Sequence, residues 1–388
     1  MYTKSNAALK HELKKGKIAQ VKSEAGIFME NILVTGGAGF IGANFIDYVL
    51  KLSTDIEIYN LDALTYAGNT ANLEKVTDPS RHHFIQGDIQ DTNLVKTIID
   101  QHQVTRIVHF AAETHVDKSL KTPEKFVAAN VWGTVSVLTA ALEVWEKRGI
   151  LNETEVRFHH ISTDEVFGEL QPGDPPFSES TPYSPNSPYS ASKAASDHFV
   201  RAFFHSFGLP VTITNCSNNY GPYQYPEKLI PLMIQNALQN KPLPVYGEGA
   251  QIRDWLYVSD HCEAIWQVLT NGIVGETYCV GGEVQPTNLE VVQTVCGILE
   301  EIRPVSGRKY ADLITFVTDR PGHDFRYAID INKIRSELGW YPKTNLYEGL
   351  RKTISWYIEN PEWIRLVTGK TDYADWIKTN YSNKRMAK

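Results

Sequence analysis

Two residues that could exchange a proton with a substrate lie four positions apart, Tyr189 and Lys193 in the segment YSASK. On a helix, a spacing of four places the phenol and the ammonium on one face. An ammonium close to a phenol lowers its pKa, so we expect Tyr189 to act as a general base toward a hydroxyl group. The pattern is common on its own, and its meaning depends on the motifs around it.

One such motif is the glycine-rich turn GGAGFIG at residues 36–42, which follows a short apolar run at 32–35. Glycines Gly36, Gly39 and Gly42 suit a turn that needs positive φ angles and that lets a diphosphate approach the amides of a helix N-terminus. Asp62, 20 residues after Gly42, ends the next predicted strand. A carboxylate there accepts hydrogen bonds from ribose hydroxyls, so the turn predicts a dinucleotide site.

The residues after Asp62 bear on which dinucleotide binds. Ala63, Leu64 and Thr65 offer no cation to receive a 2′-phosphate, and the Asp62 carboxylate would repel one. The sequence therefore favours NAD over NADP. With this cofactor in place, we expect Lys193 to bind the nicotinamide ribose as well as to assist Tyr189.

A third motif, Thr163-Asp164-Glu165, brings two adjacent carboxylates to the end of a predicted strand. Adjacent residues on an extended strand point to opposite faces. Asp164 and Glu165 can therefore serve one substrate only if the strand ends or bends at this point. Gly168, shortly afterwards, supports a bend.

These motifs need a scaffold, and the chain from Asn31 onward alternates strand and helix patterns. We expect strands at 32–35, 56–61, 83–86, 106–111, 156–162, 211–214 and 276–280, the last returning to the first sheet. Helices are expected from Phe40 and at 93–101, 123–145 and 189–207. The fold class is α/β, a doubly wound Rossmann-type parallel sheet with a smaller C-terminal α/β substrate-binding domain.

The expected domain division is a Lys-rich, disordered extension at residues 1–28, an NAD-binding domain at 29–214 and a mainly substrate-binding domain at 215–388. Some segments of the last domain are expected to return to the first. After Asn215 the texture changes to stretches rich in Pro, Tyr and Gly.

Composition and charge indicate which partners the protein binds and in which cellular compartment it works. The net charge of -7 over 388 residues gives no basic field for nucleic acid. The four cysteines are widely separated and have no metal-ligand spacing, which indicates reduced thiols and no metal site. Without a signal peptide or an uninterrupted apolar run of membrane-spanning length, the protein is expected to be cytoplasmic and to bind no membrane.

The sequence resembles the extended short-chain dehydrogenase/reductase family from about Asn31 onward, and within it the dTDP-glucose 4,6-dehydratase family. The segments that carry the resemblance are ILVTGGAGFIGANF, LDALTYAGN, FAAETHVDKS, STDEVFGEL, SPYSASKAASDH, SNNYGPYQYPEKLIPL, QIRDWLYV and DRPGHDFRYAID. The glycine turn and the YxxxK pair mark only the larger family, whereas several of the other segments are specific to the dehydratases.

The resemblance implies conversion of dTDP-glucose to dTDP-4-keto-6-deoxyglucose and water, in deoxysugar biosynthesis of the rhamnose type. Tyr189 and NAD oxidise C4, Glu165 removes the C5 proton, Asp164 protonates the departing C6 hydroxyl, and the hydride returns to C6. Thr163 is implied to hydrogen-bond the C4 oxygen. A plain 4-epimerase has no evident task for two adjacent carboxylates, so the pair favours dehydration.

The resemblance also implies contacts around both ligands. The cofactor is expected to contact the glycine turn, residues 62–65, Tyr189 and Lys193. It is also expected to contact Phe40, Ile41, Asp88, Ile89, Ala111, Ala112 and Asn219. The nucleotide sugar is expected to meet Thr114, Asn218, Lys228, Leu229, Pro244, Tyr246, Arg253, Asn288, Arg320 and His323. Histidines 109, 159 and 160, in strand patterns, are interpreted as packing residues, and His115 as structural.

Three alternatives remain open on the sequence alone. The chain could be a 4-epimerase, a UDP-sugar dehydratase or decarboxylase of the same larger family, or a non-catalytic NAD-binding protein. The last would be expected to lack some of Thr163, Asp164, Glu165, Tyr189 and Lys193, and all five are present. By resemblance, the helices starting near Pro123 and Tyr189 pair in a homodimer.

Overall fold

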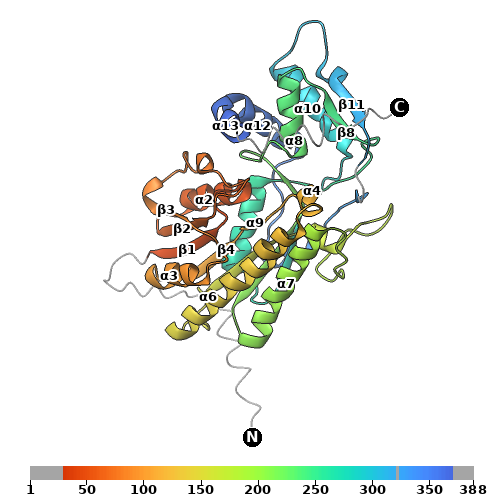
Figure 1. Ribbon diagram of the computed structural model, residues 1–388. Coiled ribbons are helices and arrows are strands. Elements are labelled where there is room, and N and C mark those ends of the chain that lie inside the picture. Colours follow the sequence, from red (N-terminus) through yellow and green to blue (C-terminus); the bar gives the residue numbers. More distant parts are fainter. Residues whose placement is uncertain (1–28, 320–322, 370–388) are drawn as a thin grey trace.

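The computed structural model describes residues 29–319 and 323–369. The N-terminal extension and Arg320 therefore lie outside the described residues. Within them, a parallel sheet runs in the order β3, β2, β1, β4, β5, β6, β10 (Figure 1). Its strands are β1 (Glu30–Thr35), β2 (Ile56–Asp62), β3 (His82–Gln86), β4 (Arg106–His109), β5 (Arg157–Thr163), β6 (Val211–Cys216) and β10 (Thr277–Val280).

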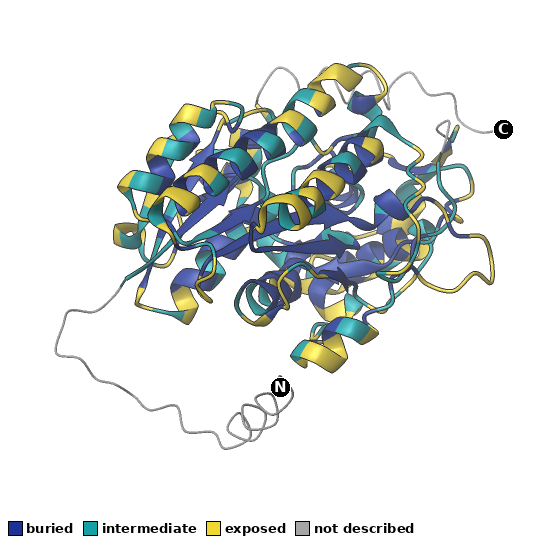
Figure 2. Cartoon of the chain, turned by 90° about the horizontal axis from the view of Figure 1, so that it is seen from below, coloured by how far each residue is buried: buried dark blue, intermediate teal, exposed yellow. Residues whose placement is uncertain are grey.

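Helices cover both faces of this sheet. On one face lie α3 (Thr92–Gln101), α6 (Gly133–Arg148) and α7 (Pro188–Phe207), whose apolar side chains join those of the strands in one core cluster. On the other face lie α2 (Phe40–Leu52) and α9 (Val258–Asn271). Figure 2 shows the strands buried between helices whose outer faces are exposed. This arrangement confirms the predicted doubly wound α/β fold.

The strand β10 confirms that the segment expected at 276–280 returns to the first sheet, where it pairs with β6. Two strand ends were wrong by two residues: β4 ends at His109, whereas we expected a strand to Ala111, and β6 continues to Cys216, beyond the expected end at Thr214. The Phe110 amide still donates to Thr35 O, and Ala111 then packs against Gly36 of the glycine turn.

The expected long helix at 123–145 is interrupted. It begins as α5 (Pro123–Phe126), widens into a π-helical segment (Val127–Trp132) and continues as α6. Within the wide turn, Asn130 accepts from the Glu113 amide and donates to Ser192 Oγ at 2.8 Å. A π-helical turn often lies at a functional site, and here it fastens the loop after β4 to α7.

A smaller lobe packs against the carboxyl edge of the sheet (Figure 1). Its core is an apolar cluster built by the helices α8 (Leu229–Leu238), α10 (Asn288–Ile302), α12 (Leu346–Glu359) and α13 (Pro361–Thr368). Two small sheets complete it, β8 (Leu243–Tyr246) with β11 (Ile314–Val317), and β7 (Asn218–Tyr220) with β9 (Trp255–Tyr257). The short helices are α4 (Val116–Ser119) and α11 (Asn332–Leu338).

Among the described residues, one helical stretch, Pro123–Arg148, is long and apolar enough to cross a membrane by length and composition. Half of its most apolar window is buried inside the molecule. The apolar character of this stretch is accounted for by packing, because Val137, Leu138, Ala141 and Trp145 belong to the core beneath the sheet.

Candidate active site

A cavity of about 900 Å³ lies at the carboxyl ends of the sheet strands. Ligands of open parallel sheets bind at this edge. The glycine turn, the loops after β2, β3 and β4, the end of β5 and the first turns of α7 all contribute to its wall. The three motifs found in the sequence therefore meet in one site.

At the glycine turn, the backbone approaches its neighbours too closely for a side chain. Gly36 has φ 74°, and a Cβ there would lie 2.6 Å from the Ala111 amide nitrogen. No side chain caps α2, whose N-cap is Gly39, so its first-turn amides are available to a ligand. Phe40 and Ile41 line the cavity at this end. The turn fits a diphosphate.

Asp62 forms the adjoining wall. Its carboxylate accepts from the amides of Ala38 at 2.9 Å and Leu64 at 2.8 Å, which fixes its position at the end of β2. Burial raises the pKa of Asp62, and these two amide bonds oppose the rise. A carboxylate held in this way suits two ribose hydroxyls, so the residues present fit NAD.

The expected cofactor residues line the cavity with one exception. Leu64 does not, because its backbone turns to φ 53° and its side chain packs with the apolar cluster beneath α2. Its contribution is the amide that holds Asp62. The cavity wall includes Gly36, Gly39, Phe40, Ile41, Gly42, Asp62, Ala63, Thr65, Asp88, Ile89, Ala111, Ala112, Tyr189, Lys193 and Asn219.

The predicted bend beside the carboxylates is present. The strand β5 ends at Thr163, and residues Asp164–Phe167 form a 3-10 turn whose Glu165 amide donates to Thr163 Oγ1. The turn closes at Gly168, with φ 92°, where a Cβ would lie 2.5 Å from Ser184 O. As a result both Asp164 and Glu165 line the cavity.

The two carboxylates differ in burial and in environment. Asp164 is 1% exposed, and burial, with Glu165 and Asp254 nearby, raises the pKa of Asp164 well above its usual value. A raised pKa favours the protonated form of this carboxyl, which is the form that a general acid requires. Glu165 is half-buried beside it. The turn therefore presents a proton donor next to a more exposed carboxylate.

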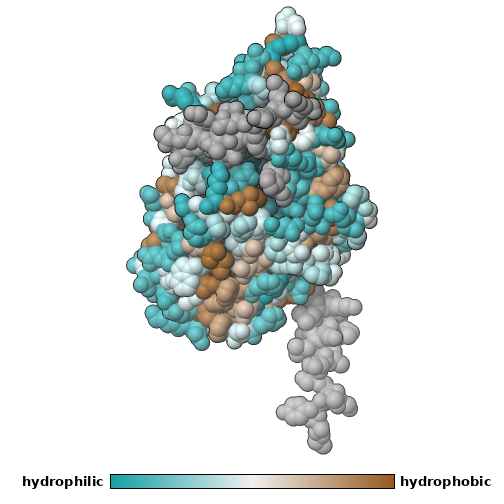
Figure 3. Space-filling model, turned by 45° about the vertical axis from the view of Figure 1, so that its right-hand side comes forward, coloured by the Kyte–Doolittle hydropathy of each residue, from teal (hydrophilic) through white to brown (hydrophobic). Residues whose placement is uncertain are grey.

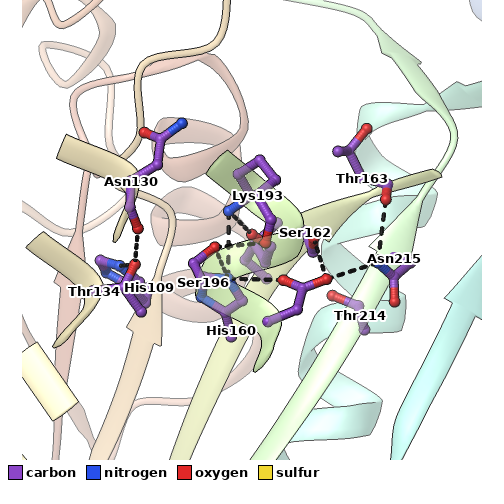
Figure 4. Close-up of polar contacts among 12 residues, drawn as sticks. His109, Asn130, Thr134, His160, Ser162, Thr163, Lys193, Ser196, Thr214 and Asn215 are labelled. Carbon is purple, nitrogen blue, oxygen red and sulfur yellow. Dashed lines mark hydrogen bonds and ion pairs between the residues drawn. The ribbon is translucent and has the colours of Figure 1, made fainter. Parts of the chain in front are cut away.

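The expected electrostatics of the Tyr189–Lys193 pair were wrong for this structure. Burial, followed by Glu165, raises the pKa of Tyr189 well above 10, and a hydrogen bond from Thr163 lowers it. The Lys193 ammonium points elsewhere: it donates to Ile161 O at 2.7 Å and lies 3.4 Å from His160 Nε2 (Figure 4). The ammonium is engaged with β5, and the pKa of Tyr189 is raised where the spacing predicted that it would be lowered.

The expected substrate residues divide into two groups. Thr114, Asn218 and Lys228 line the cavity. Arg253 is 6% exposed, and its guanidinium donates to the carbonyls of Ile252, Asp324 and Phe325 while lying 4.3 Å from the Tyr327 ring centre. The residues that do not line the cavity are Leu229, Pro244, Tyr246, Arg253, Asn288 and His323.

Four of these residues nevertheless gather around the small sheet of β8 and β11. Pro244 and Tyr246 lie on β8, and the His323 ring meets that of Tyr246 edge-on, 6.1 Å between centres. His323 Nδ1 lies 2.7 Å from Asp319 Oδ1. Asn288 begins α10, and its amide donates to Gln251 O.

Some cavity residues were missed by the motif reasoning. Glu227 is 5% exposed and lies 3.7 Å from the Lys118 ammonium, which in turn stacks 3.3 Å over the Tyr66 ring. All three line the cavity. They lie within segments that carry the family resemblance, and this was the only signal that could have identified them. His115 is the N-cap of α4, consistent with a structural role.

The three histidines predicted to be packing residues, His109, His159 and His160, are buried in the sheet. His109 contacts Thr35 Oγ1 and Thr134 Oγ1, and His159 contacts two threonines of β6, which agrees with packing roles. His160, however, adjoins Lys193 and is more than a packing residue. No cluster of three metal-ligating side chains occurs among the residues described.

The family model for GDP-mannose 4,6-dehydratase matches residues 33–353. The dTDP-glucose 4,6-dehydratase of Neisseria meningitidis serogroup B is 52% identical over 338 residues, 86% of this chain and 95% of the relative. The solved Streptomyces venezuelae dTDP-glucose 4,6-dehydratase, with NAD and TYD bound, is 44% identical, with a TM-score of 0.78 over 87% of this chain and 99% of that one.

A more distant structural neighbour is the UDP-glucose 4-epimerase of Thermotoga maritima, solved with UDP-glucose. It is 25% identical, with a TM-score of 0.74, and the match covers 85% of this chain and 99% of that one. The fold is thus shared with epimerases. The sequence identity is higher with the dehydratases, at 52% and 44%, than with the epimerase, at 25%. This chain belongs to the dTDP-glucose 4,6-dehydratase family, a family of NAD-dependent enzymes.

Proposed function

We propose that this protein converts dTDP-glucose to dTDP-4-keto-6-deoxyglucose and water, for deoxysugar biosynthesis of the rhamnose type. The observation that carries the proposal is the 3-10 turn at Asp164, which brings a carboxyl of raised pKa and Glu165 into one cavity with Tyr189. Elimination of water needs both an acid and a base. Relatives about half identical to this chain carry the same activity in their names.

We assign the cofactor end to NAD, held by the amides after Gly36, by Asp62 and by Lys193. Bound there, NAD would supply the hydride acceptor for C4 and, once reduced, the hydride donor for C6, and its positive charge would favour the phenolate form of Tyr189. Tyr189 accepts the C4 hydroxyl proton, and Thr163 donates a hydrogen bond to the C4 oxygen. The residues proposed to contact NAD and the nucleotide sugar are those that the family resemblance implies for each of these two ligands.

The elimination follows from the turn after β5. With C4 a ketone, the C5 hydrogen is acidic, and Glu165 removes it. The C6–O bond breaks as Asp164 donates its proton, so that hydroxide leaves as water. Glu165 then returns a proton to C5. Over one cycle Tyr189 gains a proton and Asp164 loses one, and exchange with solvent restores both.

The second candidate is a 4-epimerase, which the Thermotoga maritima neighbour favours on fold alone. An epimerase leaves the C6 hydroxyl in place, so its reaction has no leaving group for the buried acid Asp164 to protonate. Residue chemistry gives weak discrimination between thymine and uracil, because one methyl group contributes only about 1 kcal/mol. Thymidine is proposed from the relatives.

The test is to incubate the purified protein, without added NAD, with dTDP-, UDP-, GDP- and CDP-hexoses in deuterated water. We expect a 4-keto sugar, seen by its alkaline absorbance, from dTDP-glucose, with deuterium at C5. A C4-inverted hexose would identify an epimerase instead, and a larger yield from UDP-glucose would correct the nucleotide.

We also propose that the protein is a cytoplasmic homodimer, paired through α6 and α7. Large apolar side chains are exposed along this side of the molecule: Leu120, Val127, Trp132, Phe199 and Phe207 are each more than 40% exposed. Figure 3 shows apolar residues gathered on the lower part of one side of the molecule. A cytoplasmic site agrees with four buried free cysteines.

The dimer is tested by replacing Trp132 and Phe199 with Glu and measuring sedimentation. We expect the double variant to be monomeric and folded. The matched control is Phe316→Glu, at an exposed phenylalanine of β11 in the other lobe, which should remain dimeric. A wild-type protein that sediments as a monomer would contradict the proposal.

We further infer that the domain division lies near residue 214, with the NAD-binding domain before it and the substrate-binding domain after it. Support comes from the separate apolar clusters of the two lobes. The exceptions are α9 and β10, which pack on the first sheet although they follow the division in sequence.

A further inference from the structure

A fully buried carboxylate, Asp197, lies one helical turn after Lys193 on α7 and does not line the cavity. The proposed mechanism gives it no proton to move. Both Asp197 and Lys193 are shielded from solvent, and a buried charge without compensation is costly. It lies on α7 directly after the turn that carries Tyr189 and Lys193, next to the residues proposed to act in the reaction.

Asp197 makes contacts on two sides. Its Oδ1 lies 3.2 Å from His160 Nε2, which itself lies 3.4 Å from the Lys193 ammonium (Figure 4). Its Oδ2 accepts from Ser162 Oγ at 2.8 Å and from Tyr183 OH at 2.8 Å. A third donor to Oδ2 is Asn215 Nδ2, which also binds Thr163 O.

This set of contacts favours the ionised form of Asp197. Although burial opposes it, the neighbouring His160, Lys193 and Ser162 lower the pKa of Asp197 below its ordinary value. Burial lowers the pKa of His160 to about 4, so that this ring is neutral. The same His160 Nε2 lies 3.2 Å from Asp197 Oδ1, 3.2 Å from Ser196 Oγ and 3.4 Å from the Lys193 ammonium, so the neutral imidazole adjoins both charges.

The surroundings of Lys193 offer few other counter-charges. The described groups that face it are His109 from β4, His160 from β5, Cys216 from β6, and Tyr189 and Asp197 from its own helix. Burial lowers the pKa of His109 and raises those of Cys216 and Tyr189, which leaves these groups uncharged near neutrality. Burial also lowers the pKa of Lys193 itself, and Asp197 opposes that effect.

We propose that Asp197 is a positioning residue for the reaction: a buried counter-charge, placed beside the neutral His160 imidazole, that keeps the Lys193 ammonium protonated and directed at Ile161 O beside the cavity. This inference deepens the proposed function, since it rests on Lys193 serving the nicotinamide ribose. Asp197 touches neither the cavity nor a reacting atom.

The sign of the expected effect follows from the pair. Replacing Asp197 with Asn removes the charge and keeps the shape, so the pKa of Lys193 falls further. The charged form of Lys193 is then present at low pH and lost as pH rises. A charged donor binds more strongly than a neutral one. NAD affinity should therefore weaken selectively at alkaline pH.

The first experiment measures NAD binding to the full chain across pH, without any sugar nucleotide. We expect Asp197→Asn to bind NAD within about twofold of wild type near pH 6 and about fivefold to tenfold more weakly near pH 9. The matched control is Ser196→Ala, which removes a neutral hydroxyl 3.2 Å from the same His160 nitrogen. Its affinity ratio to wild type should not change with pH.

The second experiment is a double-mutant cycle in urea denaturation, using Asp197→Asn, Lys193→Met and both together. If the two residues form a compensated pair, the double variant is more stable than the sum of the single losses predicts. Additive losses, or a pH-independent loss of NAD affinity in Asp197→Asn, would overturn the inference. Neither experiment uses substrate, so failure of the dehydration test would leave both results interpretable.

Discussion

The cofactor end and the substrate end of the cavity differ in how their walls are made. At the cofactor end, the wall is backbone and short side chains that follow directly after β1, β2 and β4. At the substrate end, the expected contacts come from the loop after β4, from β7, the start of α8, β8, the segment before β9, α10 and the loop before residue 326. Only three of them, Thr114, Asn218 and Lys228, reach the cavity wall. One end is built by local sequence, and the other by the packing of one lobe on another.

This difference teaches which functional predictions a motif can support. A glycine turn fixes its own geometry, because its φ angles and close backbone contacts are set within a few residues. Arg253, by contrast, is fixed by carbonyls of residues 324 and 325 and by the Tyr327 ring. Its direction depends on a part of the chain about 70 residues away.

The largest expected effect lies where the two ends meet, at the carboxylate turn. We expect Glu165→Gln to lower turnover by roughly 100-fold to 10,000-fold, because a general base is lost. C4 oxidation should still proceed, so reduced nicotinamide accumulates on the enzyme and is seen by its absorbance after mixing with dTDP-glucose. Turnover without that accumulation would assign C5 proton removal to another group.

A second change targets the cofactor end. Gly36→Ala places a Cβ 2.6 Å from the Ala111 amide at φ 74°, so we expect a loss of about 1–3 kcal/mol in unfolding free energy, together with weaker NAD binding. Gly297→Ala is the control, because Gly297 lies in α10 and a Cβ added there would meet nothing within 4 Å. There, helix propensity should raise stability by roughly 0.5–1 kcal/mol. Urea denaturation measures both; equal losses would contradict the argument.

A third change targets the substrate end. Arg253→Lys keeps the charge and loses the forked donors, leaving buried carbonyls short of partners at a cost of about 1–3 kcal/mol. We expect a higher KM for dTDP-glucose with NAD affinity unchanged. Arg326→Lys, in the segment that bridges to Ile252 beside Arg253, serves as the comparison, with a smaller effect. An equal loss of NAD affinity would show that the two ends are not independent.

The smallest expected effect concerns Asp254, buried beside Arg253, whose pKa burial raises to about 6. A raised carboxyl pKa means that the folded state holds its proton to higher pH than the unfolded state. The stability contribution of Asp254 is thus greatest at low pH and falls as pH rises toward about 6. Asp254→Asn should flatten the unfolding free energy over that interval; an unchanged pH dependence in urea denaturation would assign it to other groups.

The sequence allowed the α/β fold, the order of motifs and most of the cofactor wall to be predicted, because each depends on short-range patterns. It did not allow the state of the Tyr189 phenol to be predicted. Helical spacing placed Lys193 near it, but the ammonium is turned toward Ile161 by contacts on β5. Nor did it indicate Asp197, whose partners come from β5, β6 and the loop at Tyr183.

The π-helical segment also escaped prediction, since its residues read as an ordinary helix. In the structure, the side chain of Asn130 in this segment hydrogen-bonds both the backbone of Glu113 and the hydroxyl of Ser192. Similarly, Glu227, Lys118 and Tyr66 form a cavity cluster across three separated segments. Residues that meet only through tertiary contacts leave no recognisable spacing pattern in the sequence.

The position of β10 has a consequence for how the protein is made. β10 pairs with β6, yet α8, β8, β9 and α9 intervene along the chain. During synthesis, β6 therefore emerges long before its outer neighbour, and its open edge can pair with other chains. Completion of the sheet waits for a contact of large sequence separation, and such contacts form slowly. Aggregation during expression should therefore be greatest for fragments that end between β6 and β10.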